Sequence, residues 1–257
     1  MTDGESTRMK LLITGAGFIG RALRREFPLL NITFLSRTER PEPWIKGEVT
    51  DFRFPAPDFT HIIHAPLFEP AFYNREPEGF LRVKEFAVAC GAKLLYVSSG
   101  AAATGTDDYA HWKRKTEALA GDDYIARLYS FIGPDLSPEK YAIMDFIYSA
   151  LQTGHITVIG DGQNTRSWMW QGDMAKALLG IMENGDRGRH YEVGSFEPHT
   201  IMSGARAVAR ETGATITIEG NRQGNMEYLP VHIHMGARYR PLEESIRLTI
   251  GALQNNT

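Results

Sequence analysis

The sequence holds a single cysteine, Cys90, in 257 residues. One cysteine excludes an internal disulfide and any metal site built from several thiolates, and it suits a reducing compartment. No apolar run approaches the roughly 20 residues of a membrane span. The start, MTDGESTR, lacks the apolar core of a secretory signal. We therefore expect a cytoplasmic protein without a membrane partner.

The sequence also lacks a strong excess of charge of one sign. Its formal net charge is -3, which argues against a surface that follows a phosphate backbone, so we expect no nucleic-acid partner. With 42% hydrophobic and 23% charged residues, the chain can bury a full core. These values predict one large α/β domain, or one domain that carries a smaller lobe.

Short apolar runs alternate with helical patterns in the first half of the chain. The stretch 77–91 is typical of a helix, because Pro77 suits its first turn and Gly91 ends it. Strands that alternate with helices predict right-handed βαβ units and a parallel sheet, which binds ligands at the carboxyl ends of its strands. The predicted strands are MKLLIT (9–14), ITFLS (32–36), HIIHA (61–65), KLLYVSS (93–99) and YIARLYS (124–130).

A glycine motif follows the first predicted strand. TGAGFIG places Gly15, Gly17 and Gly20 in the spacing GxGxxG between a strand and a helix, which is the context that a dinucleotide site requires. Gly15 permits the tight turn, Gly17 lets the backbone approach a pyrophosphate, and Gly20 allows close packing. The alternative is an ordinary glycine-rich turn.

The second predicted strand ends at Ser36, where an NAD-binding protein would place a carboxylate for the ribose 2′-hydroxyl. A serine cannot do this. Arg37 and Arg40 follow, and guanidinium groups suit a 2′-phosphate because they donate charge-assisted, bidentate hydrogen bonds. The sequence therefore predicts NADP rather than NAD, with NAD still allowed. The alternative is that both arginines are only solvated.

Tyr109 and Lys113 lie four positions apart, so a helix places them on one face. A free tyrosine is a poor base at neutral pH, but a nearby ammonium favours the phenolate, so a tyrosine in this pattern can act as an acid or a base on a carbonyl or hydroxyl. Ser98 and Ser99 end the preceding strand and are candidates to hydrogen-bond the same oxygen.

These motifs, with several others in the same order, resemble the extended short-chain dehydrogenases/reductases, a family of NAD(P)-dependent nucleotide-sugar epimerases, dehydratases and ketoreductases. The resemblance covers about residues 9–250. It rests on GAGFIG, GEVTD (47–51), IIHAP, YVSS with YAHWK, RLYSFIGP (127–134), ITVIGDGQNTRSWMWQGDMAKAL (156–178) and RPLEESIRLTI.

The resemblance implies a Rossmann-like, doubly wound parallel sheet with a smaller, discontinuous C-terminal substrate lobe. We expect residues 9–133 and about 186–200 to form the dinucleotide-binding domain, and residues 134–185 and 201–254 to form the lobe. The resemblance also allows a homodimer, because relatives commonly dimerise through two helices, one of which carries the tyrosine and lysine. The alternative is that the shortened loop before this tyrosine alters this surface.

Site residues follow from the same resemblance. Lys113 would bind the nicotinamide ribose, Arg166 the substrate diphosphate, and Ser130 would contact the substrate. The other residues expected at the cofactor are Phe18, Ile19, Glu48, Val49, His64 and Ala65.

The sequence departs from the family pattern near the expected active site. Gly100 stands where relatives carry the catalytic Ser or Thr, so Ser99 is the candidate substitute. The segment from Gly105 to Tyr109 is much shorter than in relatives, which predicts an open site. His232 and His234 share one face of a predicted strand, but no Cys, Asp or Glu lies at suitable local spacing, so we expect no metal site.

We therefore expect an NADP(H)-dependent oxidoreductase that acts on a keto-sugar, which the resemblance makes nucleotide-linked. Tyr109 would protonate the carbonyl oxygen while Lys113 fixes the ribose. One alternative is an NAD(P)-dependent sugar epimerase or dehydratase that retains its cofactor. The other, motivated by Gly100 and the shortened segment, is a non-catalytic dinucleotide sensor or partner-binding protein.

Overall fold

The computed structural model describes residues 9–15, 17–37, 43–50, 58–65, 70–224, 226–231 and 239–255. Contacts divide the chain into two compact units. The first unit comprises Met1–Leu128 and Ala175–Glu192, and the second comprises Tyr129–Met174 and Val193–Thr257. The chain therefore passes from one unit to the other three times.

The first unit is built on a seven-stranded sheet with the order β11-β6-β5-β4-β1-β2-β3. The neighbouring pairs from β3 to β6 are parallel, so their carboxyl ends share one edge. This confirms the predicted Rossmann-like α/β fold. The strands are β1 (Lys10–Thr14), β2 (Asn31–Ser36), β3 (Trp44–Lys46), β4 (His61–His64), β5 (Lys93–Ser99), β6 (Tyr124–Leu128) and β11 (His190–Val193).

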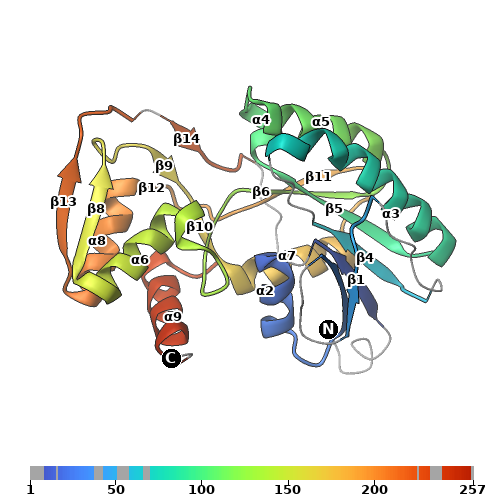
Figure 1. The fold of residues 1–257 in the computed structure, drawn as a ribbon, viewed down its shortest axis with the longest axis horizontal. Coiled ribbons are helices and arrows are strands. Elements are labelled where there is room, and N and C mark those ends of the chain that lie inside the picture. The colour runs from blue at the N-terminus through green and yellow to red at the C-terminus, as the bar shows by residue number, and fades with distance from the viewer. Residues whose placement is uncertain are drawn as a thin grey trace. The chain divides into compact units, whose positions relative to one another are not determined.

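Helices cover both faces of this sheet (Figure 1). Helix α3 begins with Pro77 in its first turn and ends at Gly91, whose φ of 62° suits a residue without a Cβ. It buries Phe80 and Val83 in a cluster with Leu12 and other strand residues. The helices of this unit are α2 (Phe18–Glu26), α3 (Glu76–Cys90), α4 (Ala101–Thr104), α5 (Asp108–Ala120) and the later part of α7 (Gln171–Asn184), with a 3₁₀ helix, η1 (Pro70–Arg75).

The second unit holds three small sheets and three helices among the described residues. The predicted strand 124–130 breaks at Tyr129, because β6 belongs to the large sheet whereas β7 pairs with β10. Its strands are β7 (Ser130–Ile132), β8 (His155–Ile159), β9 (Thr165–Arg166), β10 (Trp168–Trp170), β12 (His199–Thr200), β13 (Thr215–Glu219) and β14 (Glu227–Tyr228). Its helices are α6 (Ala142–Thr153), α8 (Ile201–Thr212) and α9 (Leu242–Gln254), with a 3₁₀ helix, η2 (Pro138–Lys140).

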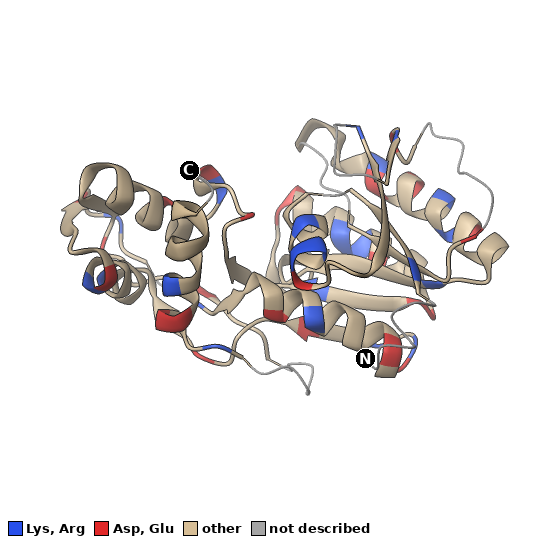
Figure 2. Ribbon diagram, turned by 90° about the horizontal axis from the view of Figure 1, so that it is seen from below, with Lys and Arg blue, Asp and Glu red and all other residues tan. Residues whose placement is uncertain are grey.

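Acidic and basic residues are interspersed along the helices of each unit (Figure 2). Several of them pair across elements, such as Lys176 of α7 with Glu26 of α2, whose Nζ and Oε1 lie 2.6 Å apart. This ion pair ties the later part of α7 to the first unit. Within the described part of the chain, every helix is too short or too polar to cross a membrane.

Candidate active site

The glycine turn joins β1 to α2 at the carboxyl edge of the sheet. Gly15 has a φ of 73°, and its carbonyl accepts a 2.8 Å hydrogen bond from the Gly17 N–H. No acidic residue occupies the first turn of α2, and no described side chain caps it. A Cβ added at Gly17 would meet no described atom within 4 Å. Among the described residues, no side chain therefore caps the N-terminus of α2, which suits binding of a dinucleotide's pyrophosphate there.

His64 lies at the point where the strand order reverses, between β1 and β4. Its Nδ1 shares a 2.6 Å hydrogen bond with Thr14 Oγ1, and its buried Nε2 has no partner among the described residues. Burial lowers the pKa of His64 to about 3, and the nearby Lys113 ammonium adds to this effect. The imidazole is therefore neutral at ordinary pH, and it lies at the sheet edge where the sequence predicts cofactor binding.

The predicted residues for the adenosine end of a dinucleotide follow β2 and β3. Ser36 is buried at the end of β2, and Arg37 is exposed directly after it. Val49 is buried, whereas Glu48 places Oε1 3.5 Å from the Arg75 guanidinium. Arg40 lies outside the described residues.

Tyr109 and Lys113 lie on the first turns of α5, as their spacing predicts. Asp107 caps this helix by accepting a 2.8 Å hydrogen bond from the Ala110 N–H. The Lys113 ammonium nitrogen is 5.6 Å from the centre of the Tyr109 ring. The Tyr73 ring of η1 lies 5.3 Å from the Tyr109 ring. Tyr109 therefore has both a cation and a second phenol as neighbours.

Glu76 was not predicted for the site, yet it contacts Lys113 directly. Its Oε1 lies 2.6 Å from Lys113 Nζ and also accepts a 2.6 Å hydrogen bond from the Tyr96 hydroxyl. Lys113 also donates to the Val97 carbonyl at 3.2 Å. Burial alone would lower the pKa of Lys113, but the Glu76 carboxylate reverses this, so the pKa of Lys113 lies well above its ordinary value. Lys113 is a fully charged member of a buried ion pair.

The two serines at the end of β5 have different partners, because successive strand residues face opposite sides. Ser98 donates a 2.6 Å hydrogen bond to the buried Glu117, which also pairs with the Arg127 guanidinium. Ser99 accepts a 3.2 Å hydrogen bond from the Ala101 N–H. Ser98 is therefore already part of a hydrogen-bonded network with Glu117 and Arg127.

The short segment before Tyr109 is tightly packed. A Cβ at Gly105 would lie 2.8 Å from both the Ala101 carbonyl oxygen and the Ala110 Cβ. Arg114 donates a 2.8 Å hydrogen bond to the Gly105 carbonyl. Helices α4 and α5 thus meet at a joint that only a glycine fits without displacing its neighbours.

In the second unit, Arg166 lies against aromatic residues. Its guanidinium carbon is 5.7 Å from the centre of the Tyr228 ring, and that ring lies 5.0 Å from the Tyr129 ring. Burial lowers the pKa of Arg166, which nevertheless stays charged at ordinary pH. Ser130 is buried at the start of β7.

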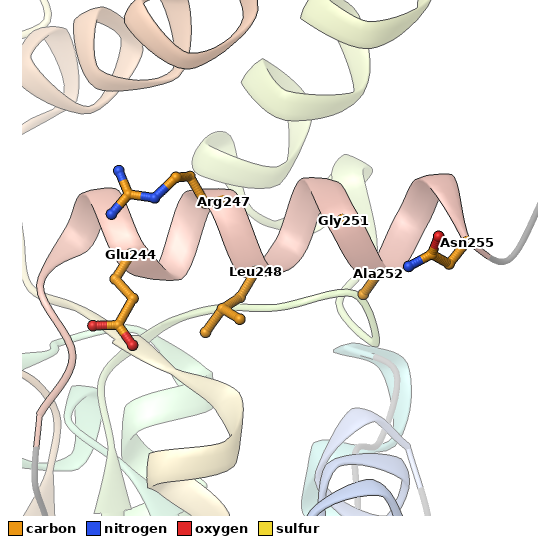
Figure 3. Close-up of a pocket in the computed structure, with 6 residues that line it drawn as sticks. All are labelled: Glu244, Arg247, Leu248, Gly251, Ala252 and Asn255. Carbon is orange, nitrogen blue, oxygen red and sulfur yellow. The ribbon is translucent and has the colours of Figure 1, made fainter.

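A hollow of about 450 Å³ lies along α9, away in sequence from every predicted site residue. Figure 3 shows Glu244 and Leu248 pointing to the same side of this helix. The remaining lining residues are Arg247, Gly251, Ala252 and Asn255.

The two histidines considered as metal ligands, His232 and His234, lie outside the described residues. In the part of the chain that the structure describes, no three His, Cys, Asp or Glu side chains gather as metal ligands would.

The sheet order and the glycine turn define the class as a Rossmann-like α/β protein. The chain belongs to the NAD dependent epimerase/dehydratase family, whose profile matches residues 11–194. This confirms the resemblance that the motifs predicted.

Two relatives from the family are UDP-glucuronic acid decarboxylases. Decarboxylase 1 of Xenopus tropicalis is 23% identical over 265 residues, which cover 82% of this chain and 62% of that protein. Decarboxylase 6 of Arabidopsis thaliana is 25% identical over 255 residues, which cover 79% of this chain and 74% of that protein. The chain therefore spans less than two thirds of the length of the Xenopus relative.

Solved structures share the fold at lower sequence identity. A dTDP-glucose 4,6-dehydratase from Bacillus anthracis in complex with NAD matches with a TM-score of 0.81 and 18% identity, covering 96% of this chain and 97% of that chain. A UDP-N-acetylglucosamine 4-epimerase from Methanobrevibacter ruminantium, in complex with UDP-N-acetylmuramic acid, also matches with a TM-score of 0.81 and 18% identity, covering 97% and 99%.

Acid should destabilise the protein partly through His64. Its native pKa of about 3 lies below the ordinary value of 6.5, so below about pH 6.5 the unfolded chain binds a proton that the native state does not. The contribution of neutral His64 to the free energy of unfolding is therefore fully present above that pH, and it is lost as the pH falls toward 3. We expect Tm to fall less steeply from pH 7 to 5 in His64→Asn than in the parent, as measured by thermal scans.

The matched control is His111→Asn, because His111 is exposed on α5. That variant should keep the parent's slope of Tm against pH. Some slope should also remain in His64→Asn, because burial lowers the pKa of His61 to about 4. An unchanged slope in His64→Asn would contradict the neutral, buried state of this imidazole.

Proposed function

We propose that the protein catalyses dinucleotide-dependent hydride transfer on a nucleotide-linked sugar. The observation that carries this proposal is Tyr109 beside the buried Lys113 ammonium, on the same sheet edge as the open glycine turn at Gly17. Family membership supports it, and the relatives named above are decarboxylases, dehydratases and epimerases of nucleotide sugars by their names.

We assign each site residue a role in cofactor binding, substrate binding or proton transfer. Gly15 and Gly17 shape a turn that lets the pyrophosphate approach the backbone N–H groups in the first turn of α2. Tyr109 gives a proton to, or takes it from, the sugar oxygen at the reacting carbon, and Ser99 hydrogen-bonds the same oxygen. Arg166 of the second unit binds the substrate diphosphate. When bound, the nicotinamide of the dinucleotide accepts or supplies the hydride.

More specifically, we propose a reductase that uses NADP(H) and releases it after each turnover. The end of β2 supports this, because Ser36 is buried there and the exposed Arg37 guanidinium is available to a 2′-phosphate. A carboxylate, which would hold an NAD ribose, is missing at this position.

The second candidate is an epimerase, dehydratase or decarboxylase that retains NAD and uses it twice on one sugar. It is favoured by the related structures, because the dehydratase from Bacillus anthracis was solved with NAD. The two candidates differ in cofactor identity and in cofactor release, so one preparation of protein can distinguish them.

The test is to denature the purified protein, identify any released dinucleotide, and titrate the emptied protein with NADPH and NADH. Little bound dinucleotide and a clear preference for NADPH would support the reductase. Retained NAD in a stoichiometric amount would support the second candidate. If neither dinucleotide binds, hydride transfer itself is excluded.

Arg37→Ala tests the NADP preference separately. Loss of a charge-assisted hydrogen bond to phosphate should weaken NADPH binding by about 10- to 100-fold and leave NADH binding nearly unchanged. The matched control is Arg206→Ala, which removes an exposed guanidinium from α8. An unchanged ratio of NADPH to NADH affinity in Arg37→Ala would exclude a role for Arg37 in cofactor choice.

A further inference from the structure

Glu76 is an acidic residue in the first turn of a helix, a place where carboxylates are usually exposed to solvent and interact with the helix dipole. Here the residue is only 2% exposed. Glu78, two positions later on the same helix, is exposed. A buried carboxylate requires compensation, because moving an unpaired charge out of water is costly. The contacts of Glu76 show what provides it.

One oxygen of Glu76 contacts two partners from different elements. Oε1 lies 2.6 Å from Lys113 Nζ on α5 and 2.6 Å from the Tyr96 hydroxyl on β5. Lys113 is held at a second point by the Val97 carbonyl. Two of the three N–H donors of the ammonium are therefore directed into the protein, and the position of Nζ is fixed.

Glu76 also places a negative charge beside the cation that lies near Tyr109. The ammonium is 5.6 Å from the Tyr109 ring centre, close enough for an uncompensated cation to favour a phenolate. The Glu76 carboxylate lies 2.6 Å from that ammonium and opposes its effect. The other titratable groups of the cluster are Tyr73 from η1, Asp107 before α5, Tyr96 from β5 and His64 from β4. Burial keeps both His64 and Tyr96 neutral at ordinary pH.

We infer that Glu76 is a positioning residue that fixes Lys113 and cancels its charge beside Tyr109, so that Tyr109 works as a proton donor. This inference rests on the proposed function for the role of Tyr109 in proton transfer. Proton donation by a phenol suits reduction of a sugar carbonyl, in which the oxygen must gain a proton as hydride adds to carbon.

The test follows the titration of the Tyr109 hydroxyl by ring-carbon NMR of isotope-labelled tyrosine, with Tyr109→Phe to assign the signal. The experiment uses the full chain without dinucleotide or sugar. In Glu76→Gln, the uncompensated Lys113 should move the titration midpoint to lower pH by about 1 to 3 units. Glu76→Asp keeps the negative charge and should restore most of the parent's midpoint.

The matched control is Glu78→Gln, which makes the same change at the exposed position and should not move the midpoint. An unmoved midpoint in Glu76→Gln, or an equal shift in Glu78→Gln, would overturn the inference. If Glu76→Gln does not yield folded protein, the double variant Glu76→Gln with Lys113→Met decides. If the two charges cancel, this double variant should titrate within about 0.5 unit of the parent, and a rise of about 1 unit or more would overturn the inference.

The outcome is separate from that of the proposed function. The titration needs neither cofactor nor substrate, so it can succeed in a protein that proves to bind no dinucleotide. Conversely, the protein can bind a dinucleotide and turn over substrate even if the titration midpoint of Tyr109 does not depend on Glu76.

Discussion

Tyr109→Phe is expected to slow hydride transfer by about 10²- to 10⁴-fold, the range that a positioned acid or base contributes. The substitution removes only the hydroxyl, so the ring can keep its contacts with Tyr73 and Lys113. Dinucleotide affinity should change little, because the proposed pyrophosphate site at the glycine turn does not include this phenol. The measurement is single-turnover oxidation or reduction of the bound nicotinamide with a panel of nucleotide sugars.

Tyr73→Phe is the matched control, because it removes a second hydroxyl from the same pair of neighbouring rings. It should slow the reaction by less than about tenfold if Tyr109 is the proton donor. A large loss of rate in Tyr73→Phe with little loss in Tyr109→Phe would show that Tyr73, and not Tyr109, transfers the proton. Full turnover in Tyr109→Phe would exclude the proposed role of this residue.

Breaking the Glu76–Lys113 ion pair should cost far more stability than removing it entirely. Both side chains are at most 4% exposed, so Lys113→Met leaves a buried carboxylate without its cation. Such losses cost about 3–5 kcal/mol, whereas replacing both partners of a buried pair is often close to neutral. We expect Glu76→Gln with Lys113→Met to be more stable than Lys113→Met alone.

The measurement is native-state hydrogen exchange at the amides of β5, because it reports local opening free energies without requiring both units to unfold together. Lys10→Met is the control: Lys10 pairs with Asp58 at 2.6 Å, but these side chains are 44% and 74% exposed. Its loss should cost only about 0–1 kcal/mol. An equally small cost for Lys113→Met would contradict a compensated ion pair in the core.

The regular elements of the first unit were predictable because their boundaries depend on local residues. Strand β5 spans the predicted 93–99, and α3 begins and ends near Pro77 and Gly91. The break at Tyr129 was missed, because an apolar run shows that a strand is buried and not which sheet it joins. Only pairing over long distances separates β6 from β7.

Only the contacts between site residues that are close in sequence could be predicted. The spacing of Tyr109 and Lys113 predicted their shared helix face, but Glu76 is 37 positions from Lys113 in sequence. Its pattern, an acidic residue beside Pro77, is typical of a solvated first helical turn. Packing of α3 against α5 brings the carboxylate and ammonium together, and no local signal predicts that contact. Whether Ser98 or Ser99 serves the substrate stays a prediction, although Ser98 already donates to Glu117.

The discontinuity of the first unit has a consequence for biosynthesis. Strand β6 pairs with β5 on one side and with β11 on the other, and β11 follows roughly 60 residues later in the chain. At about 5–20 residues per second, a ribosome needs several seconds to make that interval. During this time the nascent sheet ends in an open edge at β6, which is a template for pairing with another chain. Folding of the first unit is therefore completed only after the whole of the second unit's first segment, Tyr129–Met174, has been synthesised.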